Sequence, residues 1–159
     1  MSVELLRSAH CVGESNLHLQ LTPAFRCDVF EDALARILVR DYALAQARIK
    51  GFEIAAIGFG IDHVHMFITN WKNFSPAKLA QLLKGFTSRM MRKHHRDVIK
   101  KHLWGKKFWS GGYFYRTVGA VNAETVRRYV DESQEYPVSS SELAAGAAQK
   151  KLLEFVTPN

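Results

Sequence analysis

Residues 52–69 read FEIAAIGFGIDHVHMFIT, and the prediction of the fold starts from this segment. It contains two apolar segments, 52–59 and 63–69, which are separated by only three residues. Two strand-like segments joined by so short a connection are typical of a β-hairpin. The sequence therefore predicts a pair of adjacent antiparallel strands in the middle of the chain.

A strand and a long helix are predicted before this hairpin. Residues 15–22 (SNLHLQLT) alternate between apolar and polar, which predicts a half-buried strand that Pro23 ends. Its two faces carry Leu17, Leu19 and Leu21 on one side and His18 and Gln20 on the other. From Asp28 to Lys50, apolar residues recur every three or four positions, which predicts a helix of about six turns. Asp28 is the expected N-cap and Gly51 the expected C′ residue.

The segments after the hairpin repeat this pattern in reverse. Ser75 as N-cap and Pro76 at the first helical position begin a second long helix, whose C-terminal half is strongly basic. Residues 108–118 (FWSGGYFYRTV) predict a strand with a bulge or bend at its two glycines. Asn122 is then the expected N-cap of a short helix that continues to about Gln134.

The predicted order is β-α-β-β-α-β with one helix appended. This order is typical of a ferredoxin-like α+β sandwich, in which two helices cover one face of a single antiparallel sheet. We expect one domain over residues 1–137 and a flexible linker and C-terminal tail over 138–159, which begins with a Ser- and Ala-rich run. The fold hosts many functions, so it does not identify one.

Composition excludes several classes of protein. The chain has 159 residues, which is too short for a TIM barrel, and its 47% hydrophobic residues argue against disorder. No apolar run is long enough to span a membrane, and the first residues do not resemble a signal peptide. Two cysteines, Cys11 and Cys27, do not form a disulfide framework. We therefore expect a cytoplasmic protein with no membrane partner.

The net charge of +7 is concentrated in one segment. Residues 89–107 (RMMRKHHRDVIKKHLWGKK) hold eight Lys or Arg side chains and one acidic residue, so this segment alone carries a charge of 8 − 1 = +7. Such a surplus favours a polyanion partner, although a solvated helix face has the same composition. The candidate phosphate contacts are Arg89, Arg92, Lys93 and Arg96. Three aromatic residues could stack on unpaired bases or belong to the core: Trp104, Phe108 and Trp109.

Two histidines in the second hairpin strand are candidate metal ligands. His63 and His65 flank Val64, and the alternation of a strand places both imidazoles on one face. That arrangement allows two nitrogens to bind one metal ion, and Asp62 could orient one of the rings. The alternative is a pair of histidines with a purely structural role.

Tyr129 lies in the predicted short helix, where its spacing from Val126, Val130 and Ser133 also fits a core residue. As a nucleophile, its hydroxyl would need activation, because the pKa of a phenol is about 10. The sequence contains no GxxxxGK[ST], GxSxG, HExxH or CxxC motif, so any chemistry would run without an ATP site.

Five segments together resemble one family, the small single-tyrosine HUH transposases (TnpA type) of single-stranded-DNA insertion sequences. In order, they are NLHLQLTP (16–23), DHVHMFI (62–68), SPAKLAQLLKGFTSRMMRK (75–93), LWGKKFWSGGYFYRTVG (103–119) and ETVRRYVDESQ (124–134). Five motifs in the correct order are far more specific than any one of them.

The resemblance implies a DNA transposase that cleaves and joins single strands. It implies that His63 and His65 bind a divalent ion, Mg or Mn, and that Tyr129 attacks the scissile phosphate to form a 5′-phosphotyrosine. It also implies a homodimer in which the tyrosine of one subunit completes the histidine site of the other. The DNA partner would be single-stranded, with hairpins at the ends of the insertion sequence.

One position departs from the family pattern. The family has its third ligand, a glutamine, four residues after the tyrosine, where this chain has Ser133. Gln134 follows at five residues, and a five-residue step rotates a side chain by about 140° on an ideal helix. We assign Gln134 as the third ligand, with Glu132, Ser133 or water as alternatives. A rolling-circle HUH nuclease and a domesticated, non-catalytic nucleic-acid-binding relative are the competing functions.

Overall fold

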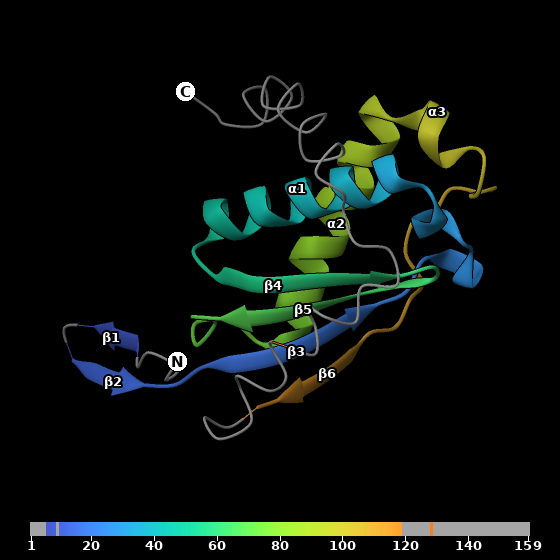
Figure 1. Ribbon diagram of the computed structural model, residues 1–159. Coiled ribbons are helices and arrows are strands. Elements are labelled where there is room, and N and C mark those ends of the chain that lie inside the picture. Colours follow the sequence, from blue (N-terminus) through green and yellow to red (C-terminus); the bar gives the residue numbers. More distant parts are fainter. Residues whose placement is uncertain (1–5, 9, 119–127, 129–159) are drawn as a thin grey trace.

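The computed structural model describes residues 6–8, 10–118 and Arg128. Four strands form one antiparallel sheet in the order β4-β5-β3-β6 (Figure 1). They are β3 (Asn16–Leu21), β4 (Glu53–Gly60), β5 (His63–Thr69) and β6 (Phe114–Thr117). The two central strands are thus β3, which has the alternating pattern of apolar and polar residues, and β5, which contains the HVH motif. The ferredoxin-like α+β fold is confirmed.

Two long helices cover one face of this sheet (Figure 1). Helix α1 (Ala33–Lys50) connects β3 to β4, and α2 (Pro76–His94) leads from β5 toward β6. The shorter elements are β1 (Leu6–Ser8), β2 (Cys11–Gly13), the 3-10 turns Ala24–Arg26 and Val29–Glu31, and α3 (Arg96–Ile99). The β1–β2 hairpin was not predicted. Among the described residues, no helix combines the length and apolar character that crossing a bilayer requires.

The helix ends confirm two predicted caps and correct one. Gly51 ends α1 with φ 85, and the Ser75 hydroxyl accepts a hydrogen bond from the Lys78 amide at 3.1 Å. The predicted start of α1 at Asp28 is wrong. The cap is Asp32, whose carboxylate accepts a hydrogen bond from the Leu34 amide at 2.9 Å, because the chain first makes a 3-10 turn that buries Val29 and Phe30.

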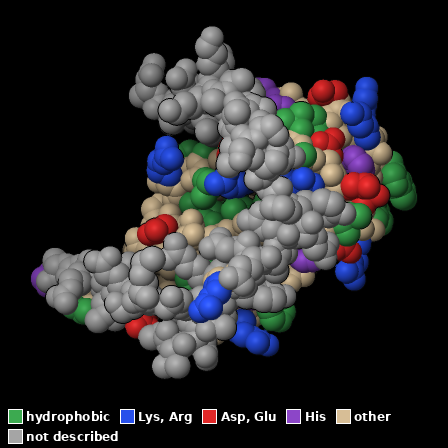
Figure 2. Space-filling model, viewed as in Figure 1, with side chains coloured by type: hydrophobic (Ala, Val, Ile, Leu, Met, Phe, Trp, Pro, Cys, Tyr) green, Lys and Arg blue, Asp and Glu red, His purple; other side chains and the backbone are tan. Residues whose placement is uncertain are grey.

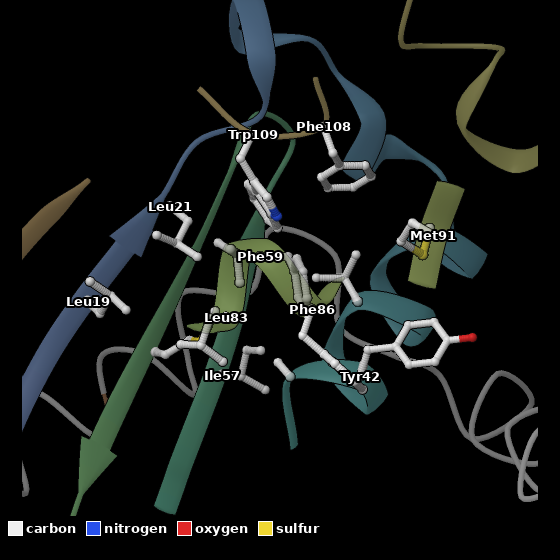
Figure 3. Close-up of a cluster of buried hydrophobic side chains, with 14 of the residues drawn as sticks. Leu19, Leu21, Tyr42, Ile57, Phe59, Leu83, Phe86, Met91, Phe108 and Trp109 are labelled. Carbon is white, nitrogen blue, oxygen red and sulfur yellow. The ribbon is translucent and has the colours of Figure 1, made fainter. Parts of the chain in front are cut away.

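The core lies between the sheet and the two helices. Figure 3 shows side chains of β3 and β4 pointing toward α1 and α2. The labelled core residues are Leu19, Leu21, Tyr42, Ile57, Phe59, Leu83, Phe86, Met91, Phe108 and Trp109. Phe108 and Trp109 are only 1% and 6% exposed, and the Trp109 indole donates to the Thr87 hydroxyl at 2.8 Å. These two aromatic residues are therefore core residues and do not stack on bases.

A bulge in β4 determines which residues reach the opposite face of the sheet. The pairing with β5 shifts between Ile54 and Ala56, so that Ile54 and Ile57 both belong to the core. Beyond the bulge, Gly58 pairs with His65 and Gly60 pairs with His63. The strand beside the two histidines therefore has no side chain at either paired position.

Candidate active site

His63 and His65 lie on the face of the sheet opposite α1 and α2. We call this side, with His18 and Gln20 of β3 and His63 and His65 of β5, the histidine face. The two imidazole centroids of β5 are 5.4 Å apart and the ring planes are nearly perpendicular, at 76°. The prediction that both rings share one face is confirmed.

The His63 ring occupies the space above Gly60. A Cβ atom built at Gly60 would lie 2.6 Å from Nδ1 and 2.8 Å from Nε2 of His63. Since real Cβ atoms do not approach other atoms so closely, the observed ring position requires glycine at this point of β4. The sequence motif therefore includes Gly60 as well as the two histidines.

A chain of polar contacts fixes the orientation of His63. Its Nδ1 lies 2.9 Å from Asp62 Oδ1, and Arg26 contacts the other carboxylate oxygen, with Nη2 at 2.9 Å and Nε at 3.1 Å. The hydrogen bond from His63, together with Arg26, lowers the pKa of Asp62. With Nδ1 engaged, Nε2 is the nitrogen that can bind a metal ion. Asp62 contacts the His63 ring, as the sequence analysis suggested. The part played by Arg26 was not predicted.

His65 is the more deeply buried of the pair, with 3% of its surface exposed. Burial lowers its pKa to about 4, and the neighbouring charges of His63 and His18 act in the same direction. His65 is therefore neutral at pH 7. Because a metal ion binds the neutral form of imidazole, His65 needs no proton removed before it can act as a ligand.

His18 and Gln20 adjoin this pair from the next strand. Gln20 pairs with His65 in the sheet register, and the His18 ring lies 5.7 Å from the His65 ring. Within the described part of the chain, the buried His18 Nε2 has no hydrogen-bond partner. Burial and then the Arg116 charge lower the pKa of His18. Sequence reasoning placed both residues on the polar face of β3 but gave them no role.

The two histidines of β5 fit a divalent ion in their chemistry. One ring is oriented through Nδ1 and the other is neutral and buried, and both lie on one face. The described residues contain no group of three or more His, Cys, Asp or Glu side chains that could hold a metal ion. They thus offer two candidate ligands, and a metal site would need further ligands from elsewhere. Tyr129, Glu132, Ser133 and Gln134 lie outside the described residues.

The four basic candidates lie at the end of α2 and the start of α3. Arg89, Lys93 and Arg96 are exposed, whereas Arg92 is half-buried and donates to the Gly105 carbonyl at 3.4 Å. Burial and the neighbouring Arg96 lower the pKa of Arg92. On the face shown in Figure 2, the described Lys and Arg side chains lie in several separate places, with acidic side chains among them. Contact of these four residues with DNA stays a prediction.

Comparison with known proteins supports the resemblance. The family model of IS200-like transposases matches residues 11–133. A candidate transposase from Deinococcus radiodurans R1 has a similar crystal structure, with a TM-score of 0.63 and 22% identity over 81% of this chain and 98% of the other. A REP-associated tyrosine transposase bound to a REP hairpin has a TM-score of 0.54 and 14% identity, over 80% and 70% of the two chains. At these identities, the two structures establish the fold. A search of curated proteins found no match.

The family match covers most of the chain and includes all four strands of the sheet, both long helices and the HVH motif. The chain therefore belongs to the family of IS200-like transposases.

Proposed function

We propose that this transposase cleaves and rejoins single-stranded DNA at the ends of an insertion sequence, by metal-dependent transesterification through a tyrosine. The observation that carries the proposal is the histidine pair of β5, which has one oriented ring and one neutral ring on the same face of the sheet. An oriented imidazole beside a neutral one is suited to binding a metal ion.

His63 and His65 would hold a divalent ion, Mg or Mn, with Gln134 as the proposed third ligand and Glu132, Ser133 or water as the alternatives. When bound, such an ion polarises a phosphoryl oxygen and stabilises the charge that develops on it. The Asp62 carboxylate keeps the His63 ring in one orientation, and Arg26 keeps the carboxylate in place.

Tyr129 is the proposed nucleophile. Its phenolic oxygen forms a bond to phosphorus while the bond from phosphorus to the 3′ oxygen breaks, which leaves a 5′-phosphotyrosine and a free 3′-hydroxyl. The phenol loses its proton, and the leaving 3′ oxygen gains one. Because the phosphodiester energy is kept in the covalent link, another 3′-hydroxyl can attack it and release Tyr129. The family match reaches residue 133 and so includes this tyrosine.

We further propose that the DNA is recognised as a hairpin and that the enzyme acts as a homodimer with shared active sites. The REP-associated relative of the same fold is bound to a REP hairpin, which supports the first point. Exposed basic residues at the end of α2, such as Arg89 and Lys93, are suited to contact phosphates. The shared active sites rest on the family resemblance.

The test is a denaturing gel of the protein incubated with Mn or Mg and labelled single-stranded hairpin oligonucleotides from DNA that flanks the gene. We expect a covalent protein–DNA adduct. Tyr129→Phe should form none, yet bind the hairpin within a few-fold of the unmodified protein. An adduct that persists in Tyr129→Phe would show that another residue is the nucleophile. Hairpin binding without any adduct would favour the non-catalytic relative.

A further inference from the structure

Two aromatic side chains stack on each other at the surface of the molecule. Phe25 and Trp104 are 75% and 76% exposed, and their rings are 5.1 Å apart with planes only 6° from parallel. Each ring therefore covers part of the other and presents most of its remaining surface to solvent. Apolar side chains that adjoin one another at the surface can mark an interaction site, whereas scattered ones do not.

The backbone at Phe25 is held in an unusual conformation. Phe25 and Arg26 have φ angles of 58° and 49°, in the left-handed region that residues other than glycine rarely adopt. The turn is anchored by the Ala24 amide, which donates to the Phe108 carbonyl at 2.9 Å. Such conformations persist where the surrounding structure enforces them, and they cluster at functional sites. Here the enforced turn keeps a phenyl ring at the surface, where it gains little from burial.

The same turn connects this aromatic pair to the histidine face. Arg26, the residue after Phe25, makes the ion pair with Asp62 at 2.9 Å, and Asp62 in turn contacts His63. One short series of covalent and polar contacts thus joins the exposed phenyl ring to a proposed metal ligand. A nucleotide whose phosphate lies at the histidine face would have its neighbours within reach of this turn.

Cationic residues lie next to the tryptophan in the sequence, and a further one contacts the residue after it. Trp104 precedes Gly105, which has φ 128 and whose carbonyl accepts the hydrogen bond from Arg92. Lys106 and Lys107 follow directly and are exposed. Aromatic rings with adjacent cations are the combination that binds unpaired bases and their phosphates, because every base has a face that can stack.

We propose that Phe25 and Trp104 form a stacking site for one unpaired nucleobase of single-stranded DNA, next to the phosphate that the histidine face binds. The two rings are too close for a base to enter between them, so the base stacks on an outer face. The location beside the scissile phosphate rests on the proposed function, whereas the binding of an unpaired base does not. From typical base–aromatic stacking, removal of the site should weaken binding by roughly 5- to 150-fold.

The first experiment measures binding of a fluorescently labelled single-stranded oligonucleotide by anisotropy, without metal and at several salt concentrations. Trp104→Ala should weaken binding within the stated range, whereas Trp104→Phe should retain most of it. The slope of log affinity against log salt should stay the same, since no phosphate contact is removed. Leu34→Ala, which changes an exposed apolar residue on α1, is the matched control and should bind normally. Equal binding by Trp104→Ala and the unmodified protein would overturn the proposal.

The second experiment places a single abasic site at successive positions of the oligonucleotide. With the unmodified protein, one position near the cleavage site should show a loss similar to that of Trp104→Ala. The two changes combined should produce little further loss, because both remove the same contact. If the loss of affinity from Trp104→Ala and the loss from the abasic site multiply at every position tested, the result would contradict base stacking.

A third measurement separates this site from an interface between two copies of the chain. Trp104→Ala should sediment like the unmodified protein, and dissociation of a dimer in that variant would overturn the proposal in favour of a protein contact.

These experiments also separate failure of the stacking site from failure of the proposed cleavage reaction. If the protein forms the covalent adduct but Trp104→Ala binds DNA normally, the stacking site is refuted and the cleavage reaction is not. If the losses from Trp104→Ala and from one abasic position overlap but no adduct forms, the cleavage reaction is refuted and the stacking site is not.

Discussion

Strand β5 has two faces that differ in almost every respect. Val64, Met66 and Ile68 are buried in the core against the two long helices, whereas His63 and His65 point to the opposite side. The core side is uniformly apolar. The histidine face instead holds polar groups, among them a neutral, buried His65 and, within the described residues, a His18 Nε2 without a hydrogen-bond partner.

Within one strand, alternate residues therefore serve different purposes: those on the core side stabilise the fold, and those on the histidine face are the candidates for catalysis. Successive side chains of a strand point to opposite faces, so the residues of the core side pack against the helices and those of the histidine face do not. The histidine face retains buried polar groups, which is the pattern expected where function constrains the choice of residues. Substitutions on the two faces should therefore change different measured quantities.

The largest effect is expected from the two proposed metal ligands, His63 and His65. His65→Ala and His63→Ala should remove all detectable metal-dependent cleavage, because each change deletes one of the two proposed ligands. The unfolding free energy should change less than it does for core substitutions. Adduct formation on a denaturing gel and urea unfolding measure the two quantities. Full cleavage activity in either variant would show that the metal assignment is wrong.

A substitution on the core side should have the opposite result. Leu19→Ala removes a fully buried side chain and leaves a cavity, so we expect the unfolding free energy to fall by about 2–5 kcal/mol. Cleavage per folded molecule should be unchanged. Urea titration followed by circular dichroism measures the change. Significant loss of cleavage in fully folded Leu19→Ala would mean that the two faces are coupled.

Gly60→Ala tests the histidine face without touching a ligand. The new methyl group would collide with the His63 ring, so the ring must move, and we expect metal-dependent cleavage to fall by roughly 10- to 100-fold, as when a ligand loses its orienting contact. Gly85→Ala on α2 is the control, because a Cβ atom there meets nothing within 4 Å. It should keep full activity and gain roughly 0.5–1 kcal/mol of stability. Normal cleavage by Gly60→Ala would contradict the observed ring position.

A smaller effect concerns pH and His95, the residue that ends α2. Burial is the main cause that lowers the pKa of His95 below 6.5, with His94 acting in the same direction and Asp97 against it. Folding therefore favours neutral His95, so the unfolding free energy should fall as pH falls from about 6.5 toward the lowered pKa, and level off below it. His95→Gln should reduce this slope in urea titrations at several pH values.

The hydrogen-bond partner of His95 provides the control for that slope. The Tyr42 hydroxyl lies 2.7 Å from His95 Nε2. Tyr42→Phe should lower stability at every pH by about 1–3 kcal/mol, because it leaves a buried nitrogen unpaired. It should keep the pH slope, since burial of His95 remains. A slope that vanishes in Tyr42→Phe would mean that the hydrogen bond, rather than burial, controls the titration.

Much of the fold could be predicted because its signals are local. The leucines of β3, the short connection between β4 and β5, and Ser75 with Pro76 each depend on a few consecutive residues. The start of α1 was predicted wrongly since Asp28 and Asp32 are both good N-caps. Burial of Val29 and Phe30 decided between them, and that is a tertiary effect.

The candidate site divides in the same way. That His63 and His65 share a face follows from their spacing. Other contacts join segments that are far apart in the sequence, so no local pattern predicts them. These are the ion pair of Arg26 with Asp62 and the stacking of Phe25 on Trp104. Phe108 and Trp109 look equally suited to bind bases until the core is seen to enclose them.

The order of the strands also has a consequence for how the protein is made. Strand β3 is the first strand of the sheet to leave the ribosome, yet its partners are β5 and β6. Gln20, for example, cannot pair with Phe114 until that residue has been synthesised. At about 5–20 residues per second, the intervening chain takes on the order of 5–20 s to synthesise. Throughout that time, β3 has at least one unpaired edge. Nascent chains of this transposase should therefore depend on chaperones more than their small size suggests.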